Sequence, residues 1–60
     1  MTSKDKWITE KCLNLVHDAK KRYAASRYEK DETKSIQISC EADRLIDDVV
    51  EGLKTLLGWQ

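Results

Sequence analysis

The chain has 60 residues, of which 40% are hydrophobic and 37% charged, so it forms one small domain near the lower limit for folding alone. Its 11 basic and 11 acidic side chains cancel, which disfavours a nucleic-acid partner, because proteins that bind nucleic acid carry excess positive charge. No apolar run approaches the roughly 18 residues that span a bilayer, and the first residues lack the apolar stretch of a secretory signal. We therefore expect a cytoplasmic protein with no membrane contact.

Apolar residues recur every three or four positions in the first half of the chain, as they do on one face of an α-helix. They are Ile8, Cys12, Leu15, Val16, Ala19 and Tyr23. The chain has no proline, and either Ser3 or Asp5 can cap the first amide groups of a helix. The pattern predicts a helix over about 4–28.

A second stripe with the same spacing follows in the other half of the chain. It consists of Ile38, Ala42, Leu45, Ile46, Val49, Leu53, Leu56 and Leu57. The two stripes are out of register, because the first, continued in steps of three and four, falls on polar residues such as Lys30, Gln37 and Arg44. One straight helix would keep a single frame. The chain therefore breaks into two helices.

The break carries neither glycine nor proline, so its position rests on the residues that can cap the second helix. Asp31, Thr33 and Ser35 are the candidates. We predict a connection over about 29–34 and a second helix over about 35–57. Gly58 then follows the last helical residue, where left-handed dihedrals are needed.

Two such helices predict an all-α fold, an antiparallel two-helix hairpin. A lone hairpin leaves the second stripe partly uncovered, because Val50 and Leu57 widen it beyond the seam between two helices. A homodimer that forms a four-helix bundle would cover it. The residues expected in the core and the dimer contact are Ile8, Leu15, Ala19, Ala42, Leu45, Val49, Leu53 and Leu56.

The two halves of the chain differ in charge. Residues 1–30 hold eight Lys/Arg and four Asp/Glu, a net +4, and residues 31–60 hold three Lys/Arg and seven Asp/Glu, a net −4. These charges either flank the core and favour antiparallel pairing, or offer a basic surface to an acidic partner. The centre of that surface would be Lys20, Lys21, Arg22 and Arg27.

Trp7 opens the first helix and Trp59 follows the second, so a hairpin brings the two positions to the same end. There they either close the edge of the core or form an aromatic anchor for a partner protein. Tryptophan is among the residues most enriched at binding hot spots, which makes Trp7 and Trp59 candidate partner-binding residues.

The cysteines and the histidine predict neither a disulfide nor a metal site. In an antiparallel hairpin Cys12 would face the region of Val50 and Cys40 the region of Arg22, too far apart for a disulfide. Two free thiols suit a reducing compartment. His17 is the only histidine and no Cys-x-x-Cys pair occurs, so we expect no bound metal and no cofactor.

The stretch Ser39-Cys-Glu-Ala-Asp43-Arg-Leu-Ile46 resembles the Ser-Gln-Glu-Leu-Asp-x-Leu-Ile signature of the small aspartyl-phosphate phosphatases that act on a sporulation response regulator in bacilli. The matching positions are Ser39, Glu41, Asp43, Leu45 and Ile46. Cys40 and Ala42 depart from the signature. That family folds as an antiparallel helical hairpin, and the resemblance implies a catalytic Asp43 supported by Ser39. The acid would orient an attacking water, with Mg²⁺ supplied by the substrate protein.

Apart from that resemblance, the residues predict no self-contained enzyme, because one histidine and so small a scaffold offer no nucleophile arrangement and no cleft. We therefore expect a non-enzymatic regulatory or adaptor protein that binds another protein as a helical-hairpin dimer. The alternative is an aspartyl-phosphate phosphatase that acts on a response regulator through Asp43.

Overall fold

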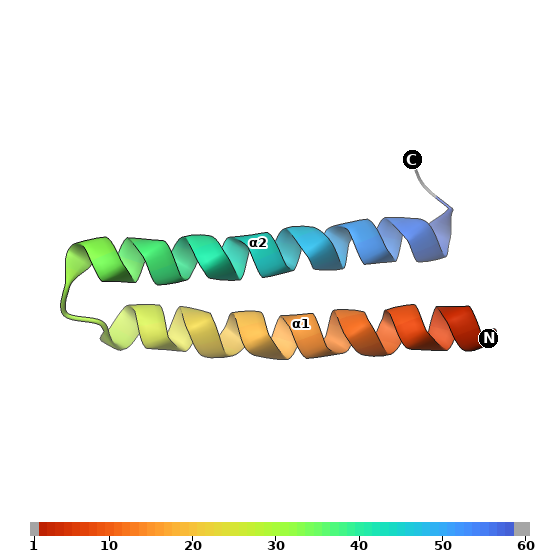
Figure 1. Cartoon of the computed structure of the whole chain (residues 1–60), viewed down its shortest axis with the longest axis horizontal. Coiled ribbons are helices and arrows are strands. Elements are labelled where there is room, and N and C mark those ends of the chain that lie inside the picture. Colours follow the sequence, from red (N-terminus) through yellow and green to blue (C-terminus); the bar gives the residue numbers. More distant parts are fainter. Residues whose placement is uncertain (1, 59–60) are drawn as a thin grey trace.

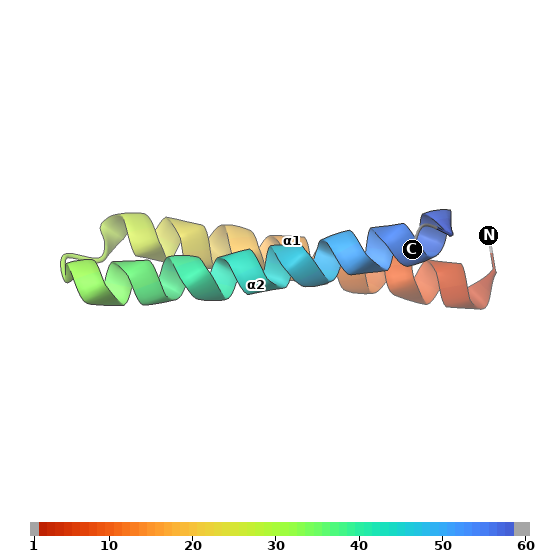
Figure 2. The ribbon, with the colours of Figure 1, turned by 90° about the horizontal axis from the view of Figure 1, so that it is seen from above.

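The computed structural model describes residues 2–58 and contains two α-helices in that range. Helix α1 spans Ser3–Tyr28 and helix α2 spans Glu32–Leu57. The helices run antiparallel and side by side, so the start of α1 and the end of α2 lie together (Figures 1 and 2). We call this the open end and the opposite one the turn end. The described residues contain no strand, which confirms the predicted all-helical hairpin.

Helix α1 is capped by Thr2 rather than by Ser3 or Asp5. The backbone of Thr2 is extended, with φ −77° and ψ 163°, and its Oγ1 accepts the N–H of Asp5 at 3.1 Å. Asp5 itself lies in the first turn, where a negative charge interacts favourably with the helix dipole. At the other end, Glu29 leaves the helix with an extended backbone and donates its N–H to the carbonyl of Ser26 at 3.3 Å.

The connection is shorter than the sequence suggests, because α2 begins at Glu32 and not near residue 35. Asp31 is the cap, and its Oδ1 accepts the N–H groups of Thr33 at 2.9 Å and Lys34 at 3.2 Å. A carboxylate that reaches two free amide groups is a strong cap at the positive end of a helix. At the far end of α2, Gly58 has φ 73° and donates its N–H to the carbonyls of Lys54 and Thr55.

Two serines join the helices at the turn end. The hydroxyl of Ser26 donates to the carbonyl of Ser35, and the hydroxyl of Ser35 donates to the carbonyl of Ser26, both at 2.8 Å. The two hydroxyl oxygens are 3.0 Å apart, and both side chains are half-buried. This reciprocal pair holds the helix backbones close together where the apolar stripe of α1 has given way to polar residues.

The core between the helices is narrow and is made largely of small side chains. The buried residues are Ile8, Cys12, Ala19, Ala42 and Val49. Leu15 and Leu56 pack partly buried against the cluster formed by Ile8, Cys12 and Val49. Ala19 and Ala42 are the most deeply buried side chains, at 1% and 0% exposure, and their small size lets the helices approach closely.

The hairpin is a single layer of two helices, with Cα extents of 44 × 20 × 10 Å. Each helix therefore has one neighbour, and only the strip of side chains that faces that neighbour is covered. Leu45 is half-buried, but Leu53, which the sequence places in the core or the dimer contact, is 47% exposed. Leu53 therefore lies outside the core of the hairpin, because it is turned towards one open face.

Gly52 interrupts α2 at a position where a side chain would not fit. A Cβ placed there would lie 2.6 Å from Cys12 Sγ, well inside van der Waals contact. Cys12 Sγ also lies 3.8 Å from the carbonyl oxygen of Val49, to which it can donate. The glycine lowers the stability of α2 by about 1 kcal/mol relative to alanine, but it allows the Cys12 thiol to pack directly against the backbone of α2.

Replacing Gly52 by alanine should lower the melting temperature, because displacing a packed side chain costs about 1–3 kcal/mol and outweighs the gain in helix propensity. In a Cys12→Ala background the same replacement should raise the melting temperature, since the new methyl group then occupies the space left by the sulfur. Thermal melts followed by circular dichroism on the four proteins test this. Shifts of the same sign in both backgrounds would contradict the close contact.

Candidate functional site

A hairpin one helix thick has two open faces, and side chains of different kinds occupy them. Trp7 and Val16 are nine positions apart in α1, which at about 100° per residue places them on opposite sides of the helix. Trp7 lines a cavity on one face and Val16 a cavity on the other, and no residue is common to both. We call the side that carries Trp7 the Trp7 face. The side that carries Val16 is called the Val50 face, after the α2 residue in the apolar row described next.

The Val50 face carries an exposed apolar row that crosses both helices. Its members, three or four positions apart along each helix, are Leu13 and Val16 of α1 and Ile46, Val50, Leu53 and Leu57 of α2. All but the half-buried Ile46 are between 40% and 66% exposed. We call these six residues the apolar row. Of these six, only Leu53 is among the residues expected in the core and dimer contact, although the sequence already shows Val50 and Leu57 widening the second stripe.

Towards the turn end, the Val50 face becomes polar. A groove of about 530 Å³ there has an apolar floor that includes Val16, Ala19 and Ile46. Its remaining lining is polar or amphipathic and consists of Lys20, Tyr23, Ser26, Arg27 and Ser39. The apolar row thus occupies the half of this face near the open end, and hydroxyl and cationic groups occupy the other half.

Tyr23 and Asp43 connect the two helices at the edge of this groove. The Tyr23 hydroxyl donates a short hydrogen bond to Asp43 Oδ1. That hydrogen bond, desolvation, and the negative charges of Asp43 and Asp47 raise the pKa of Tyr23 above its ordinary value of 10.0. The sequence places Tyr23 in the apolar stripe and does not reveal this contact, because the contact depends on the register between the helices.

The two residues implied by the phosphatase resemblance lie one turn apart on α2 but differ in surroundings. Ser39 is half-buried and lines the groove, whereas Asp43 is exposed and engaged by Tyr23. Lys20 and Arg27 line the same groove from α1. The structure therefore brings a hydroxyl and two cations together, with the carboxylate of Asp43 beside them.

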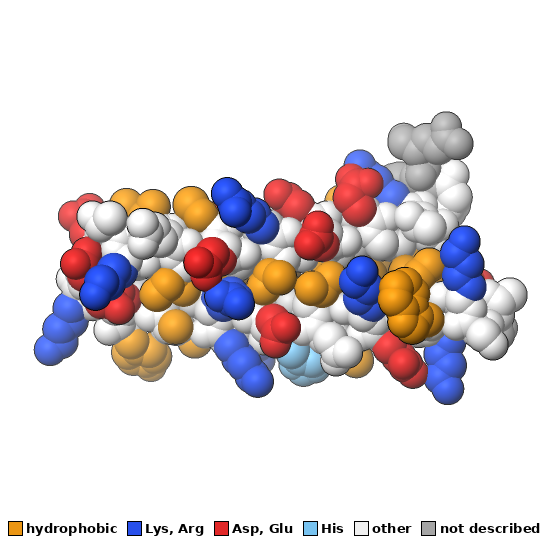
Figure 3. Space-filling view, in the orientation of Figure 1, with side chains coloured by type: hydrophobic (Ala, Val, Ile, Leu, Met, Phe, Trp, Pro, Cys, Tyr) orange, Lys and Arg blue, Asp and Glu red, His pale blue; other side chains and the backbone are white. Residues whose placement is uncertain are grey.

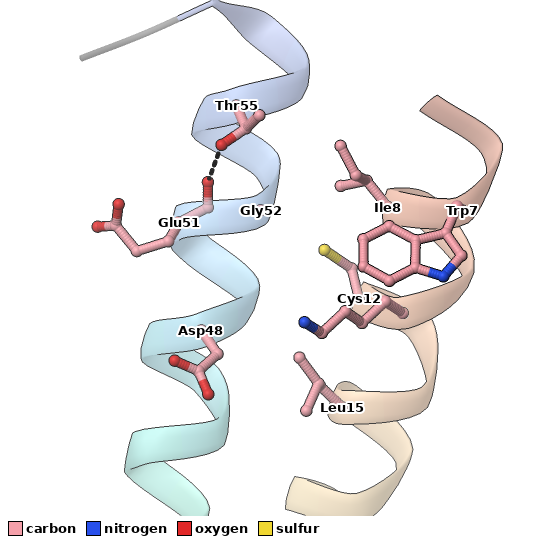
Figure 4. Close-up of a pocket in the computed structure, with 9 residues that line it drawn as sticks. Trp7, Ile8, Cys12, Leu15, Asp48, Glu51, Gly52 and Thr55 are labelled. Carbon is pink, nitrogen blue, oxygen red and sulfur yellow. Dashed lines mark hydrogen bonds between the residues drawn. The ribbon is translucent and has the colours of Figure 1, made fainter. Parts of the chain in front are cut away.

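The Trp7 face holds a cavity of about 420 Å³ near the open end. Figure 4 shows Ile8, Cys12 and Leu15 pointing from α1 towards α2, where Gly52 presents only backbone. Trp7 covers one rim, is 61% exposed, and has the Lys11 ammonium 5.2 Å from its ring centroid. Asp48 and Glu51 line the α2 side. Trp59, the second predicted anchor, lies outside the described residues.

The basic residues predicted as one surface are distributed around α1. Arg22 Nη1 lies 2.6 Å from Glu41 Oε2 of α2, in a pair whose side chains are about half exposed. Lys20 and Arg27 line the groove of the Val50 face, and Lys21 is exposed on the side of α1 away from α2. On the face seen in Figure 3, acidic and basic side chains alternate beside an apolar seam.

No cluster of three or more potential metal ligands occurs among the described residues, and neither described helix contains a stretch long and apolar enough to cross a membrane. Cys12 and Cys40 are both free thiols. No protein family, curated protein or solved structure was found to match this chain. The two open faces are therefore the features of this chain that bear on its function.

The Tyr23–Asp43 contact predicts how one tyrosine responds to pH. In a Tyr28→Phe variant Tyr23 is the one tyrosine left, and its phenolate absorbance should rise at a higher pH in the folded than in the urea-unfolded protein. Adding Asp43→Asn should lower the pKa of Tyr23. Because the pKa of Tyr23 is raised in the folded protein, the contact stabilises the fold below pH 10.0. This stabilisation is lost as the pH rises through the pKa that Tyr23 has in the folded state. Equal titration midpoints in folded and unfolded protein would refute the contact.

Proposed function

We propose that this protein is a non-enzymatic regulatory or adaptor protein that binds another protein and works as a homodimeric four-helix bundle. The observation that carries the proposal is the apolar row on the Val50 face. Five large apolar side chains of this row are 40–66% exposed in a chain of 60 residues. Contiguous exposed apolar patches of this kind mark interaction surfaces in small proteins.

The free energy of burial favours a second copy as the occupant of this row. Complete burial of a Val or Leu side chain contributes about 1.5–3 kcal/mol, and the hairpin leaves a large part of that unrealised at Val16, Val50 and Leu53. Stacking two single-layer hairpins face to face gives the two-layer arrangement of a four-helix bundle. In the bundle, the apolar rows of both chains would be buried together, and they would add to the five buried residues of each hairpin.

The Trp7 face supplies the surface for the partner protein, because it stays open when two Val50 faces pack together. Trp7 is exposed beside a cavity with an apolar floor and charged sides. A large apolar side chain of a partner fits such a cavity, and tryptophans at a cavity rim are typical of binding hot spots. The free thiols of Cys12 and Cys40 suit the reducing conditions of the cytoplasm.

Sedimentation equilibrium tests the dimer at micromolar concentration. The native chain should sediment as a dimer, and its melting temperature should rise with concentration, because association stabilises the folded state. Val50→Lys should shift the protein to a monomer, since a charge at the centre of the contact cannot be desolvated cheaply.

Trp7→Lys is the matched control, because it puts the same charge at an exposed apolar site on the opposite face. It should leave dimerisation unchanged. A native chain that is a compact monomer, with a melting temperature independent of concentration, would contradict the proposal. Loss of the dimer in both variants would show that the contact is not confined to the Val50 face.

The second candidate is phosphatase action on a phosphorylated response regulator, and the groove of the Val50 face is the observation that favours it. Ser39 lines that groove with Lys20 and Arg27, one helical turn from Asp43. Cationic side chains of this kind could contact the phosphoryl group of a phosphoaspartate, while Asp43 oriented a water.

Dephosphorylation of a phosphorylated receiver domain tests this candidate. Under it, Asp43→Ala and Asp43→Asn should both abolish an activity that the native chain shows, while helicity is retained because Asp43 is exposed. Tyr23→Phe removes the hydrogen bond but leaves the carboxylate, and should keep the activity. Equal rates for the native chain, the variants and buffer would exclude phosphatase action on that substrate.

A further inference from the structure

We propose a specific arrangement of the bundle: the two hairpins pack with both turns at the same end, so that α1 of each copy lies across from α2 of the other. This inference rests on the proposed dimer and adds its internal geometry. Two arrangements bring one Val50 face onto another with twofold symmetry. The first is the one proposed, with both turns at the same end. In the second, the turns lie at opposite ends, so α1 faces α1 of the other chain and α2 faces α2.

The position of the apolar row along the hairpin distinguishes the two arrangements. Contacts across the hairpin show which residues are level with each other: Cys12 lies against Val49, and Arg22 pairs with Glu41. From these pairs, Leu13 is level with Val50, whereas Leu53 and Leu57 lie further towards the open end. The turn half of the same face is lined by Lys20, Arg27 and Ser39.

With both turns together, the apolar halves of the two Val50 faces lie at the same end, and Leu13 and Val16 of each copy come across from Val50 and Ile46 of the other. With the turns apart and the chains fully overlapped, α2 faces α2, so Leu53 and Leu57 would lie over the turn end of the second copy's α2, near Ser39 and beyond its apolar row. That arrangement would leave the open-end part of each apolar row unpaired, and the apolar burial of those leucines would be lost.

The charges of the helices favour the same arrangement. Helix α1 carries seven Lys/Arg and three Asp/Glu, a net +4, and α2 carries three Lys/Arg and six Asp/Glu, a net −3. Packed helices lie about 8–10 Å apart, which is close to the Debye length of about 8 Å at physiological salt. With the turns together, every basic helix has acidic helices as its lateral neighbours. With the turns apart, α1 faces α1 and α2 faces α2, and like charges repel.

One pair illustrates this complementarity. Lys20 of α1 and Asp43 of α2 lie on the Val50 face at nearly the same level. With the turns together, Lys20 therefore comes opposite the helix that carries Asp43 in the second copy. With the turns apart, Lys20 lies against the α1 of the second copy, which has the same sign of charge. With the turns apart, the two hairpins could also slide along each other until only their apolar halves overlapped. In that case α1 would still face α1, and the like charges would still repel.

Distances between spin labels in the intact dimer test the arrangement. Lys30→Cys puts a thiol at the turn, in a Cys40→Ser background where the remaining native thiol, Cys12, is buried. Pulsed electron paramagnetic resonance should give an interspin distance no larger than the width of a bundle, about 20–24 Å, plus the label arms. With the turns apart, the labels would be separated by roughly the 44 Å length of the hairpin.

His17→Cys in the same background is the matched control, because residue 17 lies near the middle of the hairpin and its labels are close in both arrangements. A short distance from both sites supports the proposal. A short distance from residue 17 with a long one from residue 30 would overturn the arrangement and retain the dimer. No dipolar coupling at either site would refute the dimer itself. The Cys40→Ser chain alone should take up no label.

The salt dependence of association gives an independent measurement without any substitution. If oppositely charged helices face each other, the association constant should fall several-fold as NaCl is raised from about 0.05 to about 0.5 M. If like helices faced each other, the same change would screen repulsion and strengthen association. An association constant that rose with salt would therefore overturn the proposal.

Discussion

Two helices packed side by side can cover only the strip of each that faces the other, and this limit governs the rest of the molecule. The Cα trace of the hairpin is 10 Å deep in its thinnest direction, and no third element among residues 2–58 covers either face. Five of the described side chains are buried, and because they are mostly small, the helices approach until backbone and side chain touch. The apolar residues just beside the strip remain in contact with solvent. The exposed apolar row follows directly from this geometry.

Close approach is achieved differently along the length of the hairpin. Near the open end Cys12 packs on Gly52, in the middle Ala19 and Ala42 are fully buried, and near the turn Ser26 and Ser35 exchange hydrogen bonds. The thiol and the serine hydroxyls also bond to backbone carbonyls of the opposite helix. These contacts fix the register between the helices, and the register decides which side chains meet on each open face.

The two faces that result differ in chemistry because the charges are placed unevenly around the helices. The Trp7 face has an aromatic rim over an apolar cavity. The Arg22–Glu41 ion pair lies on the same side, because Arg22 is fifteen positions after Trp7 and so about 60° from it around α1. An ion pair with both side chains about half exposed contributes little to stability, so its main effect is on the charge pattern of that face. The Val50 face has an apolar half and a polar half. The proposed division of roles, with one face for self-association and the other for a partner, rests on that difference.

The sequence by itself determined that the chain forms two helices, because apolar spacing and a shift of frame are local properties that any helix expresses. It also located the glycine that ends α2 and the stripe whose centre is buried. It could not choose among Asp31, Thr33 and Ser35 as the cap, since each has a side-chain acceptor, and it gave no reason for Gly52. Periodicity measures only the angle of a residue around its own helix. The tertiary structure decided the register across the seam, and with it the Tyr23–Asp43 contact, the Arg22–Glu41 pair and the exposure of Leu53, because each depends on where the second helix lies.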